Sequence, residues 1–147
     1  MTGQALEAGP IRCLLGMLGT DVHTKGIRTL AQLLRDRGVE VIYLGEHNTA
    51  QGMVSAILAE DVDVVGLSFS TATYVHYTRG LLEAMKAAGV DDVPVMLGGL
   101  IHREDEAELK SIGVKGIFGP GSTTNQIMQF LEDITGKSLI RVRDSLA

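Results

Sequence analysis

Residues 11–44 read IRCLLGMLGTDVHTKGIRTLAQLLRDRGVEVIYL, and two sequence periods within this stretch decide the fold. Residues 11–18 form a short apolar run, which is typical of a strand that is buried on both faces. Apolar residues then recur at i, i+3, i+4 and i+7 from Ile27 onward, so residues 26–37 predict a helix with one buried stripe. A second apolar run at 40–44 follows after a short connection. A strand, a helix and a strand in this order favour parallel strands joined by a right-handed crossover.

The same alternation continues to residue 134. The predicted strands are residues 11–18, 40–44, 62–69, 93–97 and 114–118, and the predicted helices are residues 26–37, 49–60, 74–88, 104–112 and 122–134. Five strand–helix repeats with short connections predict an α/β fold, namely a doubly wound, five-stranded parallel sheet in the flavodoxin-like (Rossmann-like) order 2-1-3-4-5. We expect one domain over residues 11–136, with flexible tails at 1–10 and 137–147.

The composition is that of one compact globular domain. Of the 147 residues, 45% are hydrophobic and 21% are charged, which excludes a disordered segment. No apolar run approaches the ~20 residues of a membrane-spanning helix, and we expect no membrane association. With 13 basic and 18 acidic residues the formal charge is −5, so we expect no nucleic-acid partner. A single cysteine, Cys13, and a first segment without a signal-peptide pattern predict a cytoplasmic protein.

The loop after the first predicted strand reads GTDVHTKG from Gly19 to Gly26. Residues two apart in an extended loop lie on the same side, so the carboxylate of Asp21 can accept the Nδ1 proton of His23. This contact would leave Nε2 unprotonated and directed outward, as a base or a metal ligand. The alternative is that Asp21 only shapes the turn or caps the next helix, with His23 in solvent. The spacing of the two residues leaves both interpretations open.

Three further predicted loops at the same sheet edge carry hydroxyls or glycines. Their residues are Ser68, Ser70, Thr71 and Thr73 after the third strand, Gly98 and Gly99 after the fourth, and Gly119, Gly121 and Ser122 after the fifth. The hydroxyls suit a polar ligand or a helix cap, and capping is the expected role of Thr71 and Thr73. The glycines allow either a close approach of a ligand to the backbone or a tight turn.

Several common ligands of this fold class do not suit these loops. Gly16 and Gly19 lack the spacing of a dinucleotide fingerprint, and a catalytic zinc site would need a third ligand beside Asp21 and His23. A phosphorelay receiver would need a phosphate-accepting Asp at the end of the third strand, where this chain has hydroxyls on both sides of Phe69.

Taken together, the segment DVHTKG (21–26), Ser68 and the pair Gly98-Gly99 resemble the D-x-H-x-x-G, S-x-L and GG signature of cobalamin-binding domains. The resemblance covers about residues 11–136. The chain is most similar to the small, stand-alone or C-terminal cobalamin domain of coenzyme B12-dependent acyl-CoA mutases, in the methylmalonyl-CoA and 2-hydroxyisobutyryl-CoA mutase group. The turn GPGS (119–122) is similar to the P-G-T turn of those proteins.

This resemblance implies that His23 is the metal ligand, binding cobalt of adenosylcobalamin from the lower axial side, with Asp21 orienting it. The displaced nucleotide tail of the cofactor then enters a slot between the first helix and the sheet. The implied cofactor-binding residues are Gly19, Thr20, Asp21, Val22, His23, Gly26, Ser68, Ser70, Gly98, Gly99, Gly119, Gly121 and Ser122. No catalytic residue is implied in this chain.

Three positions depart from the pattern of the family. Met17 stands where many acyl-CoA mutases have a lysine that extends the His–Asp pair. Ser70 replaces the leucine of S-x-L, and His102 replaces a proline that commonly follows the glycine pair. His102 is expected beside the slot, as a ligand or an interface contact.

The implied function is that of a cobalamin-binding small subunit of an adenosylcobalamin-dependent acyl-CoA mutase, an isomerase that is inactive as this chain alone. A separate TIM-barrel subunit would bind the acyl-CoA and support the radical rearrangement of its carbon skeleton. That large subunit and a G-protein chaperone of the mutase are the implied protein partners. Two alternatives keep the cofactor: a corrinoid protein that carries methyl groups, and a non-catalytic cobalamin carrier or sensor. Amino-acid mutases such as glutamate mutase also use a similar small subunit.

Overall fold

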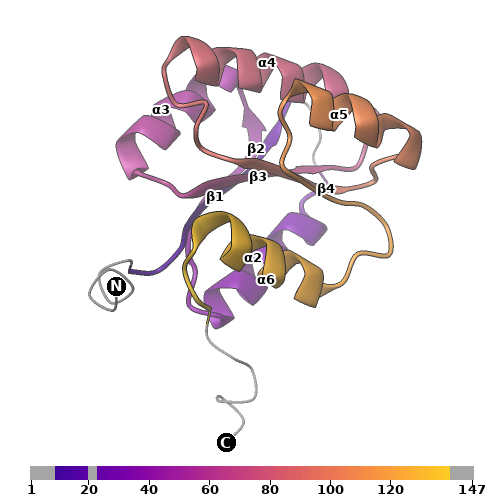
Figure 1. The fold of residues 1–147 in the computed structure, drawn as a ribbon. Helices are drawn as coiled ribbons and strands as arrows, with labels where there is room; N and C mark the ends of the chain where they lie inside the picture. The colour runs from indigo at the N-terminus through magenta and orange to yellow at the C-terminus, as the bar shows by residue number, and fades with distance from the viewer. Residues whose placement is uncertain (1–8, 20–22, 140–147) are drawn as a thin grey trace, which may run out of the picture.

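The computed structural model describes residues 9–19 and 23–139. In chain order the elements are β1 (Arg12–Leu18), α2 (Lys25–Asp36), β2 (Glu40–Asn48), α3 (Ala50–Glu60), β3 (Val64–Phe69), α4 (Tyr74–Ala87), β4 (Val95–Gly99), the 3₁₀ turn η1 (Arg103–Asp105), α5 (Glu106–Ile112), β5 (Gly116–Phe118) and α6 (Thr124–Thr135). The strands pair in parallel in the order β2-β1-β3-β4-β5. The predicted doubly wound order is confirmed, with the strand order reversing between β1 and β3 (Figure 1).

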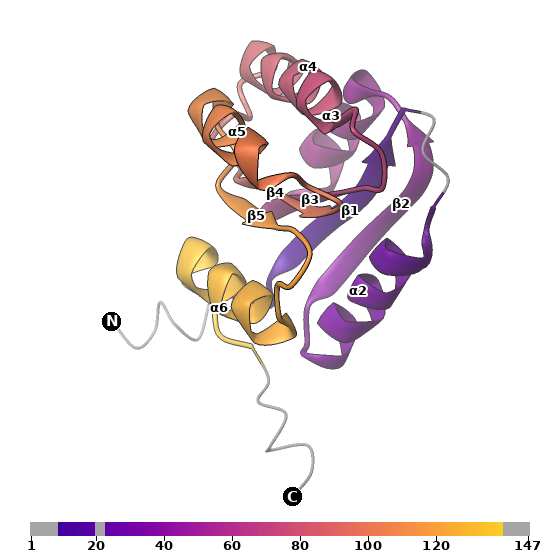
Figure 2. The same ribbon diagram turned by 90° about the vertical axis from the view of Figure 1, so that its right-hand side faces the viewer.

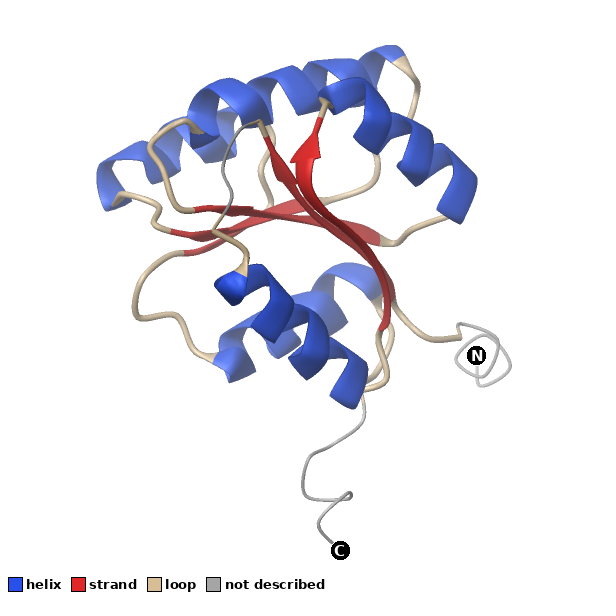
Figure 3. Ribbon diagram, turned by 180° about the vertical axis from the view of Figure 1, so that it is seen from behind, coloured by secondary structure: helices blue, strands red, loops and turns tan. Residues whose placement is uncertain are grey.

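The sheet lies between two layers of helices. Helices α2 and α6 cover one face, and α3, α4 and α5 cover the other (Figure 1 and Figure 3). Successive side chains of β1 divide between the two faces, because side chains alternate along a strand. Leu14 and Leu18 pack with α3 and α4, whereas Cys13, Leu15 and Met17 pack with α2 and α6. Burial on both faces explains why β1 reads as a continuous apolar run.

Strand β2 is longer than the predicted 40–44 because an irregular segment extends it to Asn48. Gly45 and His47 have positive φ angles of 67° and 65°, and the register with β1 shifts along this part. The Asn48 Nδ2 group donates hydrogen bonds to the carbonyl oxygens of Met17 at 3.1 Å and Gly45 at 2.9 Å. Side-chain hydrogen bonds therefore hold a polar extension that hydrophobic patterning does not predict.

The last helix and the segment after it also differ from the sequence-based boundaries. Helix α6 begins at Thr124, two residues later than predicted, because Thr123 and Gln126 form a reciprocal capping box. The ordered contacts continue beyond residue 136: Lys137 Nζ donates to a carboxylate oxygen of Asp63 at 3.0 Å, and Leu139 is buried. Among the helices described between residues 25 and 135, none is long and apolar enough to cross a membrane.

Candidate functional site

Because the strands are parallel, the loops that follow β1, β3, β4 and β5 all leave the sheet at the carboxyl ends of the strands, which we call its carboxyl edge (Figure 2). The backbone N–H of Leu100 donates to the carbonyl oxygen of Phe69 at 2.9 Å, which joins the ends of β3 and β4. Gly99 makes this junction possible: its φ is 108°, and a Cβ at this position would lie 2.0 Å from the same oxygen. The glycine at 99 is therefore required by the backbone itself.

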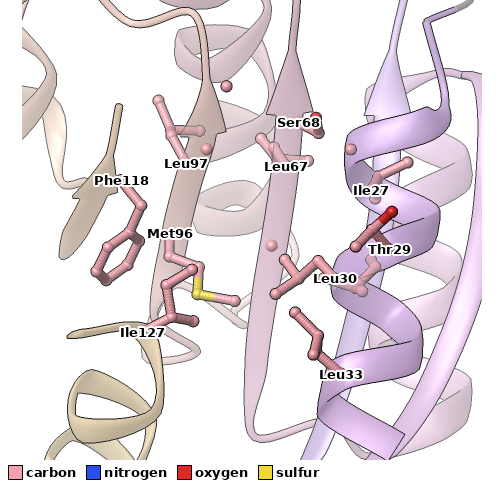
Figure 4. Close-up of a pocket in the computed structure, with 15 residues that line it drawn as sticks. Ile27, Thr29, Leu30, Leu33, Leu67, Ser68, Met96, Leu97, Phe118 and Ile127 are labelled. Carbon is pink, nitrogen blue, oxygen red and sulfur yellow. The ribbon is translucent and has the colours of Figure 1, made fainter. Parts of the chain in front are cut away.

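Below this edge, a cavity of about 230 Å³ lies between the sheet, α2 and α6. We call this cavity the slot. Four residues predicted from the sequence line it, namely Gly26, Ser68, Gly98 and Gly99. Figure 4 shows the hydroxyls of Ser68 and Thr29 among apolar side chains that come from β4, β5, α2 and α6. The slot thus has apolar walls with a few hydroxyl groups near them, which is the usual lining of a small-molecule site.

Two glycines leave space in the slot that the fold does not need. A Cβ built at Gly26 would meet no atom within 4 Å, and one built at Gly98 would come no closer than 3.7 Å to the Phe118 carbonyl oxygen. Gly98 is two residues beyond Met96 on β4, so its missing side chain belongs to the face covered by α2 and α6. A side chain at either position would narrow the slot, so the two glycines keep space in it that a ligand can occupy.

An exposed imidazole stands beside the slot, three residues before Gly26. The Nδ1 atom of His23 lies 2.9 Å from the hydroxyl oxygen of Ser70, a half-buried residue directly after β3. This hydrogen bond brings together the loops that follow β1 and β3. Nε2 lies on the other side of the ring, and in the tautomer with the proton on Nδ1 this second nitrogen carries the lone pair that a base or a metal ligand needs.

The structure describes only some of the residues that precede His23 and were discussed from the sequence. Thr20, Asp21 and Val22 lie outside the described residues, so the predicted contact between Asp21 and His23 stays a prediction. Met17, at the position of the lysine in the family pattern, is fully buried in the layer between the sheet and α2. Its thioether brings no charge to the loop.

Other predicted site residues lie apart from the slot. Gly19 packs against α4: with φ at 78°, a Cβ there would lie 2.4 Å from the ring of Tyr77. Gly119, Gly121 and Ser122 do not line the slot; they border a separate depression that also includes Arg103. The structure therefore gives Gly19 a packing role and does not bring the three residues after β5 to the slot.

His102 lies on the side of α4 and α5, outside the residues that line the slot. Its backbone N–H donates to the hydroxyl of buried Tyr74 at 3.0 Å, and that hydroxyl donates to the carboxylate of Asp105. Thr73, expected to cap α4, occupies the cap position but makes no capping hydrogen bond; its hydroxyl lies 2.9 Å from that of Thr71.

Sequence reasoning missed part of the slot wall on α2. Thr29, Leu30 and Leu33 line the slot, whereas Ala31 and Leu34 are buried in the core and do not line it. Gly26, Leu30 and Leu33 follow each other at i, i+4 and i+7, which is a helical stripe next to the core stripe. That spacing was a usable signal for a second face of this helix.

Comparison with known proteins gives concordant matches. The family described as B12 binding domain matches residues 11–128. The pivalyl-CoA mutase small subunit of Xanthobacter autotrophicus is 38% identical over 129 residues, which are 88% of this chain and 86% of that protein. The 2-hydroxyisobutanoyl-CoA mutase small subunit of Aquincola tertiaricarbonis is 34% identical over 112 residues, 76% of this chain and 82% of that protein. A crystal structure of a cobalamin-binding protein from Desulfitobacterium hafniense shares the fold, with a TM-score of 0.68 and 23% identity over 83% of this chain and 59% of that chain.

Proposed function

This chain belongs to the B12-binding domain family, and on that premise we propose that it is the cobalamin-binding small subunit of an adenosylcobalamin-dependent acyl-CoA mutase. The relatives that support the mutase role are two small subunits of acyl-CoA mutases, and the chain spans more than four fifths of each. The structural observation that carries the proposal is the slot beside an imidazole: Gly26 and Ser68 line the slot, and His23 stands next to it.

The residues at this edge suit the parts of the cofactor. His23 is the proposed lower axial ligand, because a neutral imidazole nitrogen is a fitting ligand for cobalt. The slot is the proposed site of the nucleotide tail: its apolar walls match an aromatic base, and the hydroxyls of Thr29 and Ser68 provide hydrogen-bonding groups. When bound, adenosylcobalamin supplies the radical chemistry of the rearrangement.

The chain's own contribution is to bind the cofactor, to orient it and to shield its lower side from water. It presents one neutral nitrogen from below, holds the tail in a slot, and excludes water from the lower side of the cofactor. Leu100, in the loop after β4, is 56% exposed and gives the carboxyl edge an apolar contact for a covering partner. The proposed partner is a large TIM-barrel subunit that encloses the acyl-CoA, so this chain alone has no mutase activity. A G-protein chaperone of the mutase is a further proposed partner, and the cytoplasm is the proposed location.

The first test is binding of adenosylcobalamin to the purified chain, followed by its absorption spectrum. We expect tight binding with the base-off, histidine-on spectrum. His23→Ala should raise the dissociation constant by more than about 10-fold, because even the hydrogen-bond partners of a metal ligand contribute 10–100-fold. His76→Ala is the matched control, since His76 is exposed and contacts Tyr77 on α4. An unchanged affinity and spectrum in the His23 variant would refute the ligand assignment.

The second test is activity with the large subunit that co-purifies with this chain from its native source. Acyl-CoA rearrangement should require both chains and adenosylcobalamin. Full turnover by the large subunit without this chain would contradict the proposal. So would methyl transfer between methyltransferases that depends on this chain, since that result would identify a corrinoid carrier.

A further inference from the structure

We infer that Ser70 is a positioning residue of this site, whose hydroxyl accepts the Nδ1 proton of His23 and so leaves Nε2 as the unprotonated nitrogen that faces the cofactor. The inference deepens the proposed function and rests on it for the identity of the ligand. The contact itself belongs to this chain, at 2.9 Å between Ser70 Oγ and His23 Nδ1.

The serine is well placed to orient the ring because it is attached to a fixed part of the sheet. Ser70 directly follows β3, which pairs with β1 on one side and β4 on the other. Its neighbour Phe69 is 1% exposed and accepts a backbone hydrogen bond from Leu100. His23 lies in the loop that precedes α2 and is exposed. The hydroxyl therefore offers His23 a hydrogen-bonding partner that is attached directly to the sheet.

The chemistry of a neutral imidazole explains why the acceptor matters. The ring carries one proton, and the hydrogen bond at one nitrogen selects which nitrogen holds it. An acceptor at Nδ1 keeps the proton there and makes Nε2 the lone-pair donor for a metal. A serine hydroxyl does this without adding charge, and it keeps its own proton to donate to another acceptor.

Two of the departures from the family pattern, Ser70 and Met17, are consistent with support of His23 by an uncharged group. Leucine, the family residue at the position of Ser70, has no atom that accepts a hydrogen bond. Met17, at the position of the family lysine, is buried and uncharged. Ser70 thus places an uncharged hydrogen-bonding group directly after β3, and Met17 adds no charge from β1. This arrangement is an alternative to the predicted contact between Asp21 and Nδ1, because a neutral imidazole has a single N–H proton to donate.

The variants for the test are Ser70→Ala, which removes the hydroxyl, and Ser70→Thr, which keeps it. Thr71→Ala is the matched control: it deletes a hydroxyl from the next residue of the same loop, and that hydroxyl lies against Thr73. Both positions are at the surface or half-buried, so the variants should fold, and urea unfolding checks this.

The first readout needs no cofactor. Long-range ¹H–¹⁵N NMR of the chain, at a pH at which the imidazole is neutral, reports the tautomer of His23. We expect the Nδ1–H tautomer in the wild type, in Ser70→Thr and in Thr71→Ala, and a shift toward Nε2–H in Ser70→Ala. The same tautomer in Ser70→Ala as in the wild type would overturn the inference.

The second readout is the dissociation constant for adenosylcobalamin. Ser70→Ala should raise it about 10-fold, the lower end of the effect of a residue that orients a metal ligand, whereas Thr71→Ala should leave it unchanged. A Ser70→Ala chain that binds as the wild type does overturns the positioning role, and the proposed function then still stands. A wild-type chain that does not bind adenosylcobalamin overturns the proposed function instead. The NMR measurement of the His23 tautomer then still tests whether the Ser70 hydroxyl accepts the Nδ1 proton.

Discussion

Gly99 ends β4 with a φ of 108°, and a Cβ there would lie 2.0 Å from the carbonyl oxygen of Phe69. Gly26 and Gly98 differ from it, because a Cβ at either position has room. At the residue scale the glycines of this site therefore fall into two groups. One is required by the backbone, and the other keeps the slot open for a ligand.

Gly99→Ala should lower the free energy of unfolding by at least about 1–3 kcal/mol, the cost of a non-glycine residue in a sparsely populated backbone region. Urea unfolding measures the loss. Gly80→Ala is the control, because Gly80 lies inside α4 with open space at its Cβ. That variant should gain about 0.5–1 kcal/mol. Equal stability of the Gly99 variant and the wild type would contradict the claim that the backbone requires glycine at position 99.

Cys13 gives a pH prediction at the same scale. Burial, and next the nearby charge of Asp63, raise the pKa of this thiol from 9.0 to about 12. Because the folded-state pKa is the higher one, the unfolded chain loses this proton first, and stability falls as the pH rises through the window from about 9 to about 12.

The loss approaches about 1.4 kcal/mol per pH unit within that window. Urea unfolding of the wild type and of Cys13→Ala at pH values on either side of the lower bound isolates this contribution. The alanine variant should show a flatter pH dependence. Identical pH dependence in the two chains would show that the thiol does not contribute.

Helix α2 shows how much of one element the sequence predicts. Its predicted core stripe is confirmed at Ile27, Ala31 and Leu34, all buried, whereas Leu30, predicted in the same stripe, is half-buried and lines the slot. The adjacent stripe of Gly26, Leu30 and Leu33 lines the slot, and the hydrophobic pattern alone does not distinguish it from the core stripe. Hydrophobic spacing identifies apolar positions on a helix, but it does not say which of them meet the core and which meet a cavity. That distinction depends on how far α2 stands from the sheet, which the packing of other elements sets.

Filling the slot tests its role at the scale of elements. Gly98→Val adds a β-branched side chain, which suits a strand, on the face of β4 that lines the slot. Binding of adenosylcobalamin should weaken by at least about tenfold, or about 1.4 kcal/mol, because the added methyl groups occupy space proposed for the nucleotide tail.

A spectrophotometric titration measures this affinity, with Gly80→Ala as a glycine variant far from the slot. Urea unfolding verifies that the valine variant keeps its fold. Wild-type affinity in a folded Gly98→Val chain would place the nucleotide tail elsewhere.

At the scale of the whole molecule, the sequence predicts the layers and the strand order correctly, because five apolar runs alternate with amphipathic stretches. It also places Ser68 at this end of the sheet, where Ser68 lines the slot, whereas the roles of His23 and Ser68 toward a cofactor stay predictions. The contact between Ser70 and His23 could not be predicted, because the two residues are 47 positions apart and meet only through the register of β1 against β3. The packing role of Gly19 against Tyr77 depends in the same way on where α4 lies.

The proposed partner should cover the carboxyl edge of the sheet, and two exposed leucines allow a matched test. Leu100 lies at this edge and is 56% exposed, whereas Leu58, near the end of α3, lies toward the opposite edge and is 59% exposed. Leu100→Glu should weaken assembly with the large subunit by about tenfold or more, because a charge would be buried in the contact. Leu58→Glu should have no effect. Analytical ultracentrifugation in the presence of adenosylcobalamin measures both, and equal assembly of the two variants would argue against this docking edge.

The central claim is that an imidazole of this chain, and not the cofactor's own base, binds the metal. Electron paramagnetic resonance of the cobalt(II) form of cobalamin, bound to the chain with and without ¹⁵N-labelled histidine, tests it directly. We predict that each cobalt line is split into three by ¹⁴N and into two after labelling, and that His23→Ala removes this change. A three-fold splitting that persists in the labelled chain would mean that the nitrogen comes from the cofactor, and it would contradict the account.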